Sequence, residues 1–251
     1  MRARRDNPRM LRRVHVQVLT VGELELPESQ AHHLRAVLRL KAEDEVELFD
    51  DRGRSGRGII THVSSNAVKV SVDAVLEPSQ SISVTVASVV PKGERADWMI
   101  EKLSELGVAR FVPLQTERSV VHPQGKSKLD RWARIAAESA KQSRRAGVMR
   151  IAPLSPLRSL LDEAPAAAFY LSTEADAPSL VSIVKSQIAD LTSVSLFIGP
   201  EGGWTDAEIA LLASRGVRPA HLTQTVLRIE TAAVTAAAVA LCIISNPPPR
   251  L

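Results

Sequence analysis

Residues 195–208 have the sequence Ser-Leu-Phe-Ile-Gly-Pro-Glu-Gly-Gly-Trp-Thr-Asp-Ala-Glu, and this stretch decides how the C-terminal part of the chain folds. The apolar run 196–198 predicts a buried strand, which ends at three glycines and a proline within residues 199–203. Glycine permits positive φ and leaves the main chain unshielded, so a ligand can contact the backbone there. Thr205 is a good N-cap, and Glu208 completes a capping box, so a helix is predicted next. A strand, a glycine-rich turn and a capped helix are typical of a small-molecule site in an α/β sheet.

This pattern alone leaves the ligand open. It is not G-x-G-x-x-G, and it lacks the Lys-Ser/Thr pair of a P-loop, so neither a dinucleotide nor a nucleoside triphosphate is indicated. The alternative is a tight strand-to-helix turn that binds nothing.

The composition bounds the class of protein. The chain has 251 residues and is 45% hydrophobic, which is enough for two modest domains with aliphatic cores. Its one cysteine, Cys242, excludes an internal disulfide and a cysteine-based metal site, and its apolar neighbours predict a buried thiol. No apolar run reaches membrane-spanning length and no hydrophobic segment follows the N-terminal arginines, so a cytoplasmic protein is expected.

Positive charge is concentrated in two blocks. Residues 1–13 carry six Arg and one Asp, and residues 118–150 carry nine Lys or Arg with one Asp and one Glu. Two basic blocks on an otherwise acidic chain predict a polyanionic partner, for which nucleic acid is the obvious candidate. A basic tail and a solvated helix face are the alternative.

The first part of the chain predicts a small β-rich domain. Strands are expected at residues 14–18, 46–49, 58–60 and 68–72, and a helix is expected after Pro27. His32 and His33 have no third ligand at a suitable spacing, so no metal site is expected. The best domain boundary is at residues 77–81.

The second part alternates strands with helices, which predicts a mostly parallel sheet covered on both faces. The expected strands are 82–90, 111–114, 167–171, 196–198 and 221–223, and the expected helices include 94–106, 128–145, 179–188 and 232–244. In the helix 94–106 we expect Trp98, Leu103 and Leu106 to point inward and Gly107 to end the helix.

A second segment, 226–232, has the sequence Val-Leu-Arg-Ile-Glu-Thr-Ala. Charged residues in such an apolar region must be paired or face a site. Helix capping by Glu230 and Thr231 is the alternative, and it explains Arg228 less well.

The segments 198–203 and 227–232 together resemble those of the SPOUT methyltransferases, and more narrowly those of the bacterial ribosomal RNA small-subunit methyltransferase E family. Residues 33–39, 101–107, 116–119 and 138–143 are also similar to segments of that family, in the same order. The resemblance covers nearly the whole chain. A motif set in the right order is specific, whereas any one motif alone would not be.

The resemblance implies an α/β fold with an N-terminal PUA-like β-barrel in residues 1–77. A C-terminal SPOUT domain with a deep trefoil knot would occupy residues 82–251. It also implies S-adenosylmethionine as cofactor, a homodimer, and methylation of N3 of a uridine in 16S rRNA, within the 30S subunit. A SPOUT enzyme that acts on transfer RNA or 23S rRNA, and a non-catalytic RNA-binding or assembly protein, are the alternatives.

The resemblance also places the site residues. The cofactor is expected at Leu171, Ser172, Thr173, Ile198, Gly199, Pro200, Glu201, Gly202, Gly203, Leu222, Thr223, Val226, Leu227, Arg228, Glu230, Thr231 and Ala232. RNA is expected at Arg9, Arg12, His33, Arg35, Arg39, Lys92, Arg118, Gln142, Arg144 and Arg145. Three positions depart from the family: Thr223 and Arg144 each stand where a glycine is usual, and Met149 stands where a proline is usual.

The reaction requires that N3 of the uracil lose its proton and that negative charge on the uracil oxygens be stabilised. Arg145, or Arg118 of the partner subunit, is the expected cation. Glu230 is a candidate proton acceptor or an organiser of the cofactor site.

Overall fold

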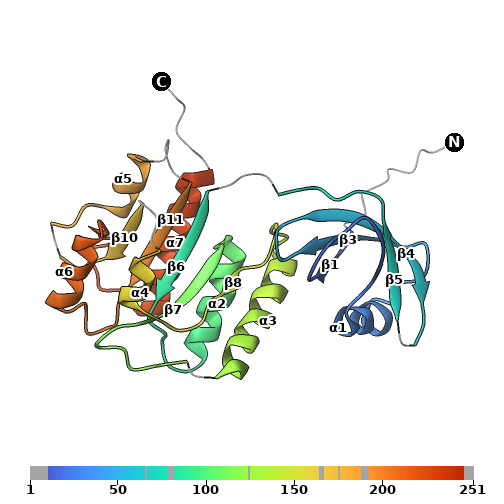
Figure 1. Ribbon diagram of the computed structural model, residues 1–251, viewed down its shortest axis with the longest axis horizontal. Helices are drawn as coiled ribbons and strands as arrows, with labels where there is room; N and C mark the ends of the chain where they lie inside the picture. Colours follow the sequence, from blue (N-terminus) through green and yellow to red (C-terminus); the bar gives the residue numbers. More distant parts are fainter. Residues whose placement is uncertain are drawn as a thin grey trace. The chain divides into compact units, whose positions relative to one another are not determined.

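The computed structural model describes residues 11–245 except 66, 79–81, 124, 164–166, 175 and 188–191 (Figure 1). Contacts divide the chain into two compact units. The first contains the chain up to Ser79 together with Arg144–Val148, and the second contains Gln80–Ser143 and the chain from Met149 onward.

The first unit is built on a five-stranded sheet. Its order is β1 (Arg12–Val16), β3 (Glu45–Asp50), β4 (Ser55–Val63), β5 (Val68–Val72) and β2 (Gly22–Glu25). The pair β1 and β3 is parallel, and the other neighbours are antiparallel. The four predicted strands are present, but the first covers residues 12–16 and not 14–18. The fifth, β2, was missed because Gly-Glu-Leu-Glu has little β propensity and pairs only at the sheet edge.

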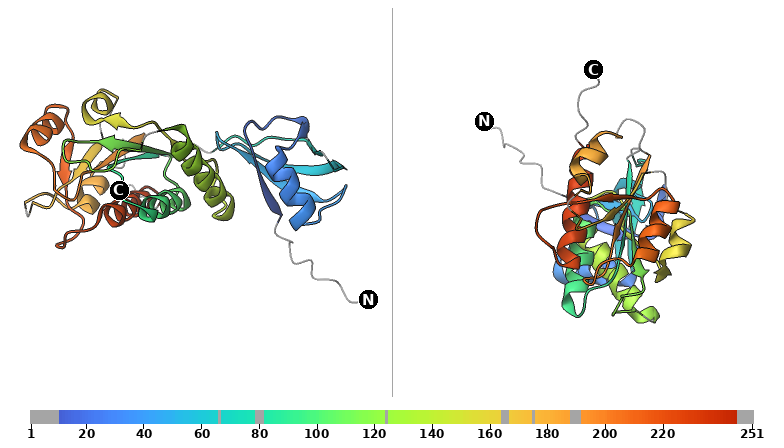
Figure 2. Two further views of the ribbon diagram at one scale, coloured as in Figure 1. Left: turned by 90° about the horizontal axis from the view of Figure 1, so that it is seen from below. Right: turned by 90° about the vertical axis from the view of Figure 1, so that its left-hand side faces the viewer.

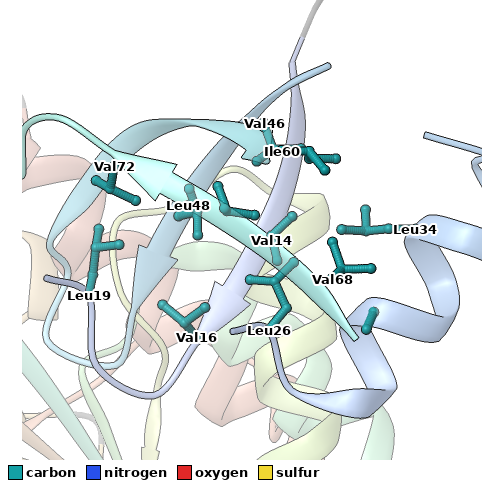
Figure 3. Packing of buried hydrophobic residues seen from close by; sticks show 12 residues of the cluster. Val14, Val16, Leu19, Leu26, Leu34, Val46, Leu48, Ile60, Val68 and Val72 are labelled. Atoms are coloured by element: carbon teal, nitrogen blue, oxygen red, sulfur yellow. The ribbon is translucent and has the colours of Figure 1, made fainter. Parts of the chain in front are cut away.

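Aliphatic side chains from these strands and from the segments between them fill one core, shown in Figure 3. Val14, Val46 and Leu48 are fully buried in it. Burying a side chain of this size stabilises the fold by about 1.5–3 kcal/mol. A Cβ atom at Gly58 would lie 2.4 Å from Val70 and 2.5 Å from Leu48, so only glycine allows β4 to pack this closely.

The helix predicted after Pro27 is only partly regular. It consists of α1 (Glu28–His32) and a π-helical turn, η1 (His33–Val37). Ala31 and Leu34 are buried against the sheet, as the helical spacing predicts.

The segment Arg144–Val148 packs on the first unit although it follows a helix of the second. Arg144 forms an ion pair with Glu47 (2.7 Å), and Nη1 of Arg13 donates to the carbonyl oxygen of Arg145 (2.9 Å). The prediction of a helix through residue 145 was wrong. The helix α3 (Lys126–Gln142) stops because Arg144 has a left-handed φ of 57°, which a helix cannot contain.

The second unit contains the parallel sheet that the alternation predicted. Its order is β12 (Arg218–Ala220), β10 (Ala168–Leu171), β11 (Ser193–Ile198), β6 (Ser83–Ser88), β7 (Arg110–Gln115) and β8 (Arg150–Ile151). Every pair in this order is parallel, and β9 (Ser155–Pro156) adds to the end of β7.

Helices cover both faces of this sheet, as expected (Figure 2, right). On one face are α2 (Glu94–Leu106), α5 (Leu180–Lys185) and α7 (Ile229–Ser245), with α3 packed on α2. On the other are α4 (Leu157–Leu161) and α6 (Asp206–Ser214). Among the described residues, no helix is long and apolar enough to cross a membrane.

Three side chains predicted to be buried are exposed instead. Trp98 and Leu106 are 45% and 37% exposed, and Cys242 is exposed as well. Each helical residue turns the side-chain direction by about 100°. The buried stripe of α2 is centred on Ala96 and Ile100, and Trp98 lies about 200° round from Ala96. Cys242 lies at the same angle from the buried Ala240 of α7.

The strand predicted at residues 221–223 lies three residues earlier, as β12. Residues 218–220 were not predicted as a strand because Pro219 is disfavoured in strands except at sheet edges, and β12 lies at an edge. Leu222 and Thr223 therefore leave the sheet. The knot implied by the resemblance stays a prediction.

Candidate functional site

The second unit has a cavity of about 410 Å³ at the carboxyl ends of β10 and β11. Three segments line it, residues 170–174, 198–204 and 222–227, with Ile209, Ile229 and Ala232. The cavity therefore brings together the two loops that the sequence singled out. All of the expected cofactor-binding residues line it except Arg228, Glu230 and Thr231.

Close packing of a tryptophan shapes the glycine-rich loop. A Cβ atom at Gly199 would lie 2.7 Å from Cε2 of Trp204, so the ring occupies the space that any side chain would need. The Trp204 ring is held in turn, because its Nε1 donates to the carbonyl oxygen of Leu171 (3.0 Å) and the ring makes a T-shaped contact with Tyr170. Trp204 was not among the predicted site residues. Its position between the glycines and the N-cap residue could have indicated that its ring packs on the turn.

The capping box at α6 is confirmed. The backbone N–H of Glu208 donates to Oγ1 of Thr205 (3.3 Å), and the Thr205 N–H donates to Oε2 of Glu208 (3.0 Å). The other carboxylate oxygen of Glu208 accepts from the backbone N–H of Glu117 (2.9 Å). Glu208 is 6% exposed, so these bonds form out of water. One buried carboxylate thus ties the 116–119 loop to the helix that follows the glycine turn.

That loop places Arg118 against the glycine turn of the same chain. Nη1 of Arg118 donates to the carbonyl oxygen of Gly202 (2.6 Å), and the side chain is exposed. The loop is held by Thr116, whose backbone N–H donates to Oγ of Ser119 (2.9 Å). A cation therefore lies at the edge of the cavity, supplied by its own chain.

The second loop leads into α7. The hydroxyl of Thr223, which stands where a glycine was expected, donates to the carbonyl oxygen of Thr225 (2.8 Å). The helix begins at Ile229, earlier than predicted, with the first bond from the Ala232 N–H to the carbonyl oxygen of Arg228 (2.8 Å). Thr231 consequently lies inside the first turn and is not the N-cap.

Glu230 is buried beside the cavity. It is 6% exposed, and its Oε1 lies 3.4 Å from Nη1 of Arg95 in α2. The same Nη1 lies 3.9 Å from Oε1 of Glu201 in the glycine turn. Arg95 was not predicted as a site residue. Its contacts are between segments more than a hundred residues apart, which sequence spacing does not show.

Comparison with known proteins assigns the family. Residues 78–241 match the model of an RNA methyltransferase domain, and residues 26–73 match that of an RNA methyltransferase PUA domain. A ribosomal RNA small subunit methyltransferase E from a Synechocystis strain is 33% identical, over 86% of this chain and 70% of the relative.

This chain belongs to the ribosomal RNA small subunit methyltransferase E family.

Two further relatives agree. The Bacillus subtilis member of the family is 31% identical, over 81% of this chain and 83% of its own length. The crystal structure of the Neisseria gonorrhoeae member, bound to S-adenosyl methionine, has a TM-score of 0.79 at 27% identity and covers 93% of this chain and 98% of that one. The expected architecture, a PUA domain followed by an α/β RNA methyltransferase domain, is confirmed.

The residues expected to contact RNA lie in both units. Arg12, Arg39, Lys92 and Gln142 are exposed, His33 begins η1, and Arg9 lies outside the described residues. Two arginines are engaged within the first unit: Arg35 with Glu28 (3.1 Å) and Arg144 with Glu47.

Arg145, the expected catalytic cation, belongs to the first unit. Burial lowers the pKa of its guanidinium to about 10, which still leaves it positively charged at neutral pH. The expectation that Arg145 stabilises negative charge on the uracil stays a prediction.

Proposed function

We propose that this family member transfers the methyl group of S-adenosylmethionine to N3 of a uridine in 16S rRNA, acting as a homodimer on the small subunit in the cytoplasm. The convergence of the 199–203 and 222–227 loops on one cavity carries the proposal. Its volume of about 410 Å³ lies within the range usual for small-molecule sites.

The residues of the cavity fit the donor. Gly203 leaves bare main chain at the cavity wall, because nothing lies within 4 Å of the place that its Cβ would take, so main-chain polar groups there can bind polar parts of a nucleoside. Ile198, Leu227 and Ala232 supply apolar surface to the lining. When bound, S-adenosylmethionine supplies an electrophilic methyl group, so the protein itself need not provide a nucleophile.

The task left to this chain is to prepare the uridine. The neutral imide N3 is a poor nucleophile, and loss of its proton places negative charge on the uracil oxygens. A guanidinium has five N–H donors, and the bond to Gly202 uses one of those on Arg118. Arg118 can therefore stabilise a uracil oxygen while it stays anchored to the loop that lines the cavity.

The positions of Glu230 and Arg145 suggest different roles. Glu230 is outside the cavity lining and paired with Arg95, which favours a role in organising the site over that of proton acceptor. Arg145 remains a second candidate cation for the uridine.

The first unit and the basic residues would hold the RNA backbone. Arg12, Arg39 and Lys92 are exposed and suited to phosphate contacts, which fix register and make binding sensitive to salt. The proposed RNA-binding set also contains His33, Arg35, Arg118, Gln142, Arg144 and Arg145, with Arg9 in the N-terminal segment.

The experiment is methylation of 30S subunits from a strain that lacks the chain's counterpart, followed by mass spectrometry of the 16S rRNA. We expect one N3-methyluridine in 16S rRNA. Methylation of transfer RNA or 23S rRNA instead would overturn the substrate assignment. Failure to bind S-adenosylmethionine in calorimetry would favour a non-catalytic RNA-binding or assembly protein.

The role of Arg118 is tested by single-turnover methylation at saturating S-adenosylmethionine and saturating 30S subunits. We expect Arg118→Ala to slow the methyl-transfer step by about 100-fold, the usual loss for one charge-stabilising donor, and Arg118→Lys to recover part of the rate. Arg134→Ala, which removes an exposed arginine of α3, is the control. A loss in Arg118→Ala that is confined to RNA affinity would remove the catalytic role.

A further inference from the structure

We propose that Arg95 is a positioning residue of the cofactor site, and that it holds the two cavity loops together through Glu201 and Glu230. The proposal rests on the proposed function for the identity of the molecule in the cavity. The clamp itself is defined by the contacts among these three residues.

The three residues come from separate elements of the second unit. Arg95 is the second residue of α2, Glu201 lies in the glycine turn after β11, and Glu230 is the second residue of α7. One nitrogen, Nη1 of Arg95, lies within ion-pair distance of both carboxylates, at 3.9 Å from Glu201 and 3.4 Å from Glu230. One side chain thus spans the loop that begins at residue 199 and the loop that ends in α7.

Burial makes the contact with Glu230 the more important of the two. The side chain of Glu230 is 8% exposed, whereas that of Glu201 is 64% exposed. A buried carboxylate is costly unless it is paired, and an exposed pair contributes little. Oε2 of Glu230 is buried and has no hydrogen-bond partner in the part of the chain that the structure describes, so its pairing with Arg95 through Oε1 matters all the more.

The helix dipoles show why this cation needs carboxylate partners. Glu230 lies in the first turn of α7, where the positive end of the helix favours a negative charge. Arg95 lies in the first turn of α2, where the same effect opposes a positive charge. α2 therefore does not stabilise the guanidinium at this place, and the carboxylates of the two cavity loops do.

The clamp reaches the cavity without entering it. Arg95 and Glu230 do not line the cavity, but Ile229 and Ala232 in the first turn of α7 do, and Glu201 does. A shift of Glu230 would carry Ile229 with it, because the two are adjacent in the same helical turn. Removal of Arg95 should therefore loosen both walls and weaken cofactor binding, while the reacting groups keep their chemistry.

Two variants and a control test this. Arg95→Ala removes the clamp, and Arg95→Lys keeps a charge of the same sign. Lys102→Ala is the matched control, because Lys102 lies on the same helix and is also paired with two carboxylates, those of Glu101 and Glu105. The measurements are S-adenosylmethionine affinity by calorimetry, and amide hydrogen exchange of residues 199–205 and 226–232 in the full-length protein without added ligand.

We expect Arg95→Ala to weaken the affinity at least tenfold and to speed exchange in both loops. Arg95→Lys should recover most of the affinity, and the affinity of Lys102→Ala should stay within twofold of the wild type. The single-turnover methylation rate of Arg95→Ala at saturating cofactor should change little. Unchanged exchange and affinity in Arg95→Ala would overturn the clamp. Absence of S-adenosylmethionine binding in the wild type would instead refute the proposed function, and the exchange experiment would still decide the clamp.

Discussion

Gly199→Ala is the sharpest test of how the cavity is built. The added Cβ would lie 2.7 Å from Cε2 and 3.0 Å from Nε1 of Trp204, so the ring must move by several tenths of an ångström. Movement stretches the bond from Trp204 to the carbonyl oxygen of Leu171, a bond that contributes about 1 kcal/mol. Overpacking adds about 1–3 kcal/mol. We therefore expect the free energy of unfolding of the second unit to fall by about 2–4 kcal/mol.

The same change should weaken cofactor binding, since Gly199, Trp204 and Leu171 all line the cavity. A distortion that costs about 1.4 kcal/mol of binding free energy lowers affinity tenfold, and we expect at least that loss. Gly202→Ala is the control in the same turn, because its Cβ would meet only Arg118, at an ordinary 3.4 Å. Calorimetric titration with S-adenosylmethionine and thermal unfolding measure both effects. Equal affinity and stability for the two variants would refute the argument that Trp204 determines the shape of this turn.

Two further predictions concern buried carboxylates. Glu208→Gln should lower the free energy of unfolding by about 1–3 kcal/mol, because the charged carboxylate that accepts hydrogen bonds from two backbone N–H groups, those of Glu117 and Thr205, becomes a neutral amide. Chemical denaturation measures this change, and a loss below about 0.5 kcal/mol would contradict the prediction. Burial alone would raise the pKa of Asp50, but the hydrogen bond from the Leu19 N–H and the ion pair with Arg54 outweigh it and hold that pKa below the usual range. The stability that Asp50 contributes is therefore present above the unfolded pKa of about 3.9 and is lost as pH falls through the folded value. Asp50→Asn should accordingly be less stable than the wild type at pH 7, with a difference that shrinks toward pH 2 in urea titrations; a difference independent of pH would contradict this.

Local signals in the sequence predicted local structure well. The cap at Thr205 and the stop at Gly107 were correct because each depends on a few adjacent residues. Gly107 adopts a left-handed φ of 103°, which glycine accepts at no steric cost. The parallel sheet followed from the alternation of strands and helices, which permits few topologies.

The parts that escaped prediction depend on contacts between distant segments. The pairing of Arg95 with Glu230 and the closeness of Trp204 to Gly199 become visible only when the chain has folded. The inward placement of Trp98 was wrong for a different reason: residues 96, 99, 100 and 103 have the helical spacing of a buried face, and Trp98 lies outside it. The fold class could be predicted, whereas the residues that hold the cavity in shape could not.

The segment Arg144–Val148 belongs to the first unit, and this limits how the two units can be exchanged between related proteins during evolution. The chain passes from one unit to the other three times, at residues 79–80, 143–144 and 148–149. A single genetic crossover near residue 80 would therefore take Glu47 from one parent and its ion-pair partner Arg144 from the other. It would likewise take the buried Arg13 from one parent and the Arg145 carbonyl group that it binds from the other. Exchange of the first unit between relatives thus requires two coordinated replacements, and the two units are expected to be inherited together.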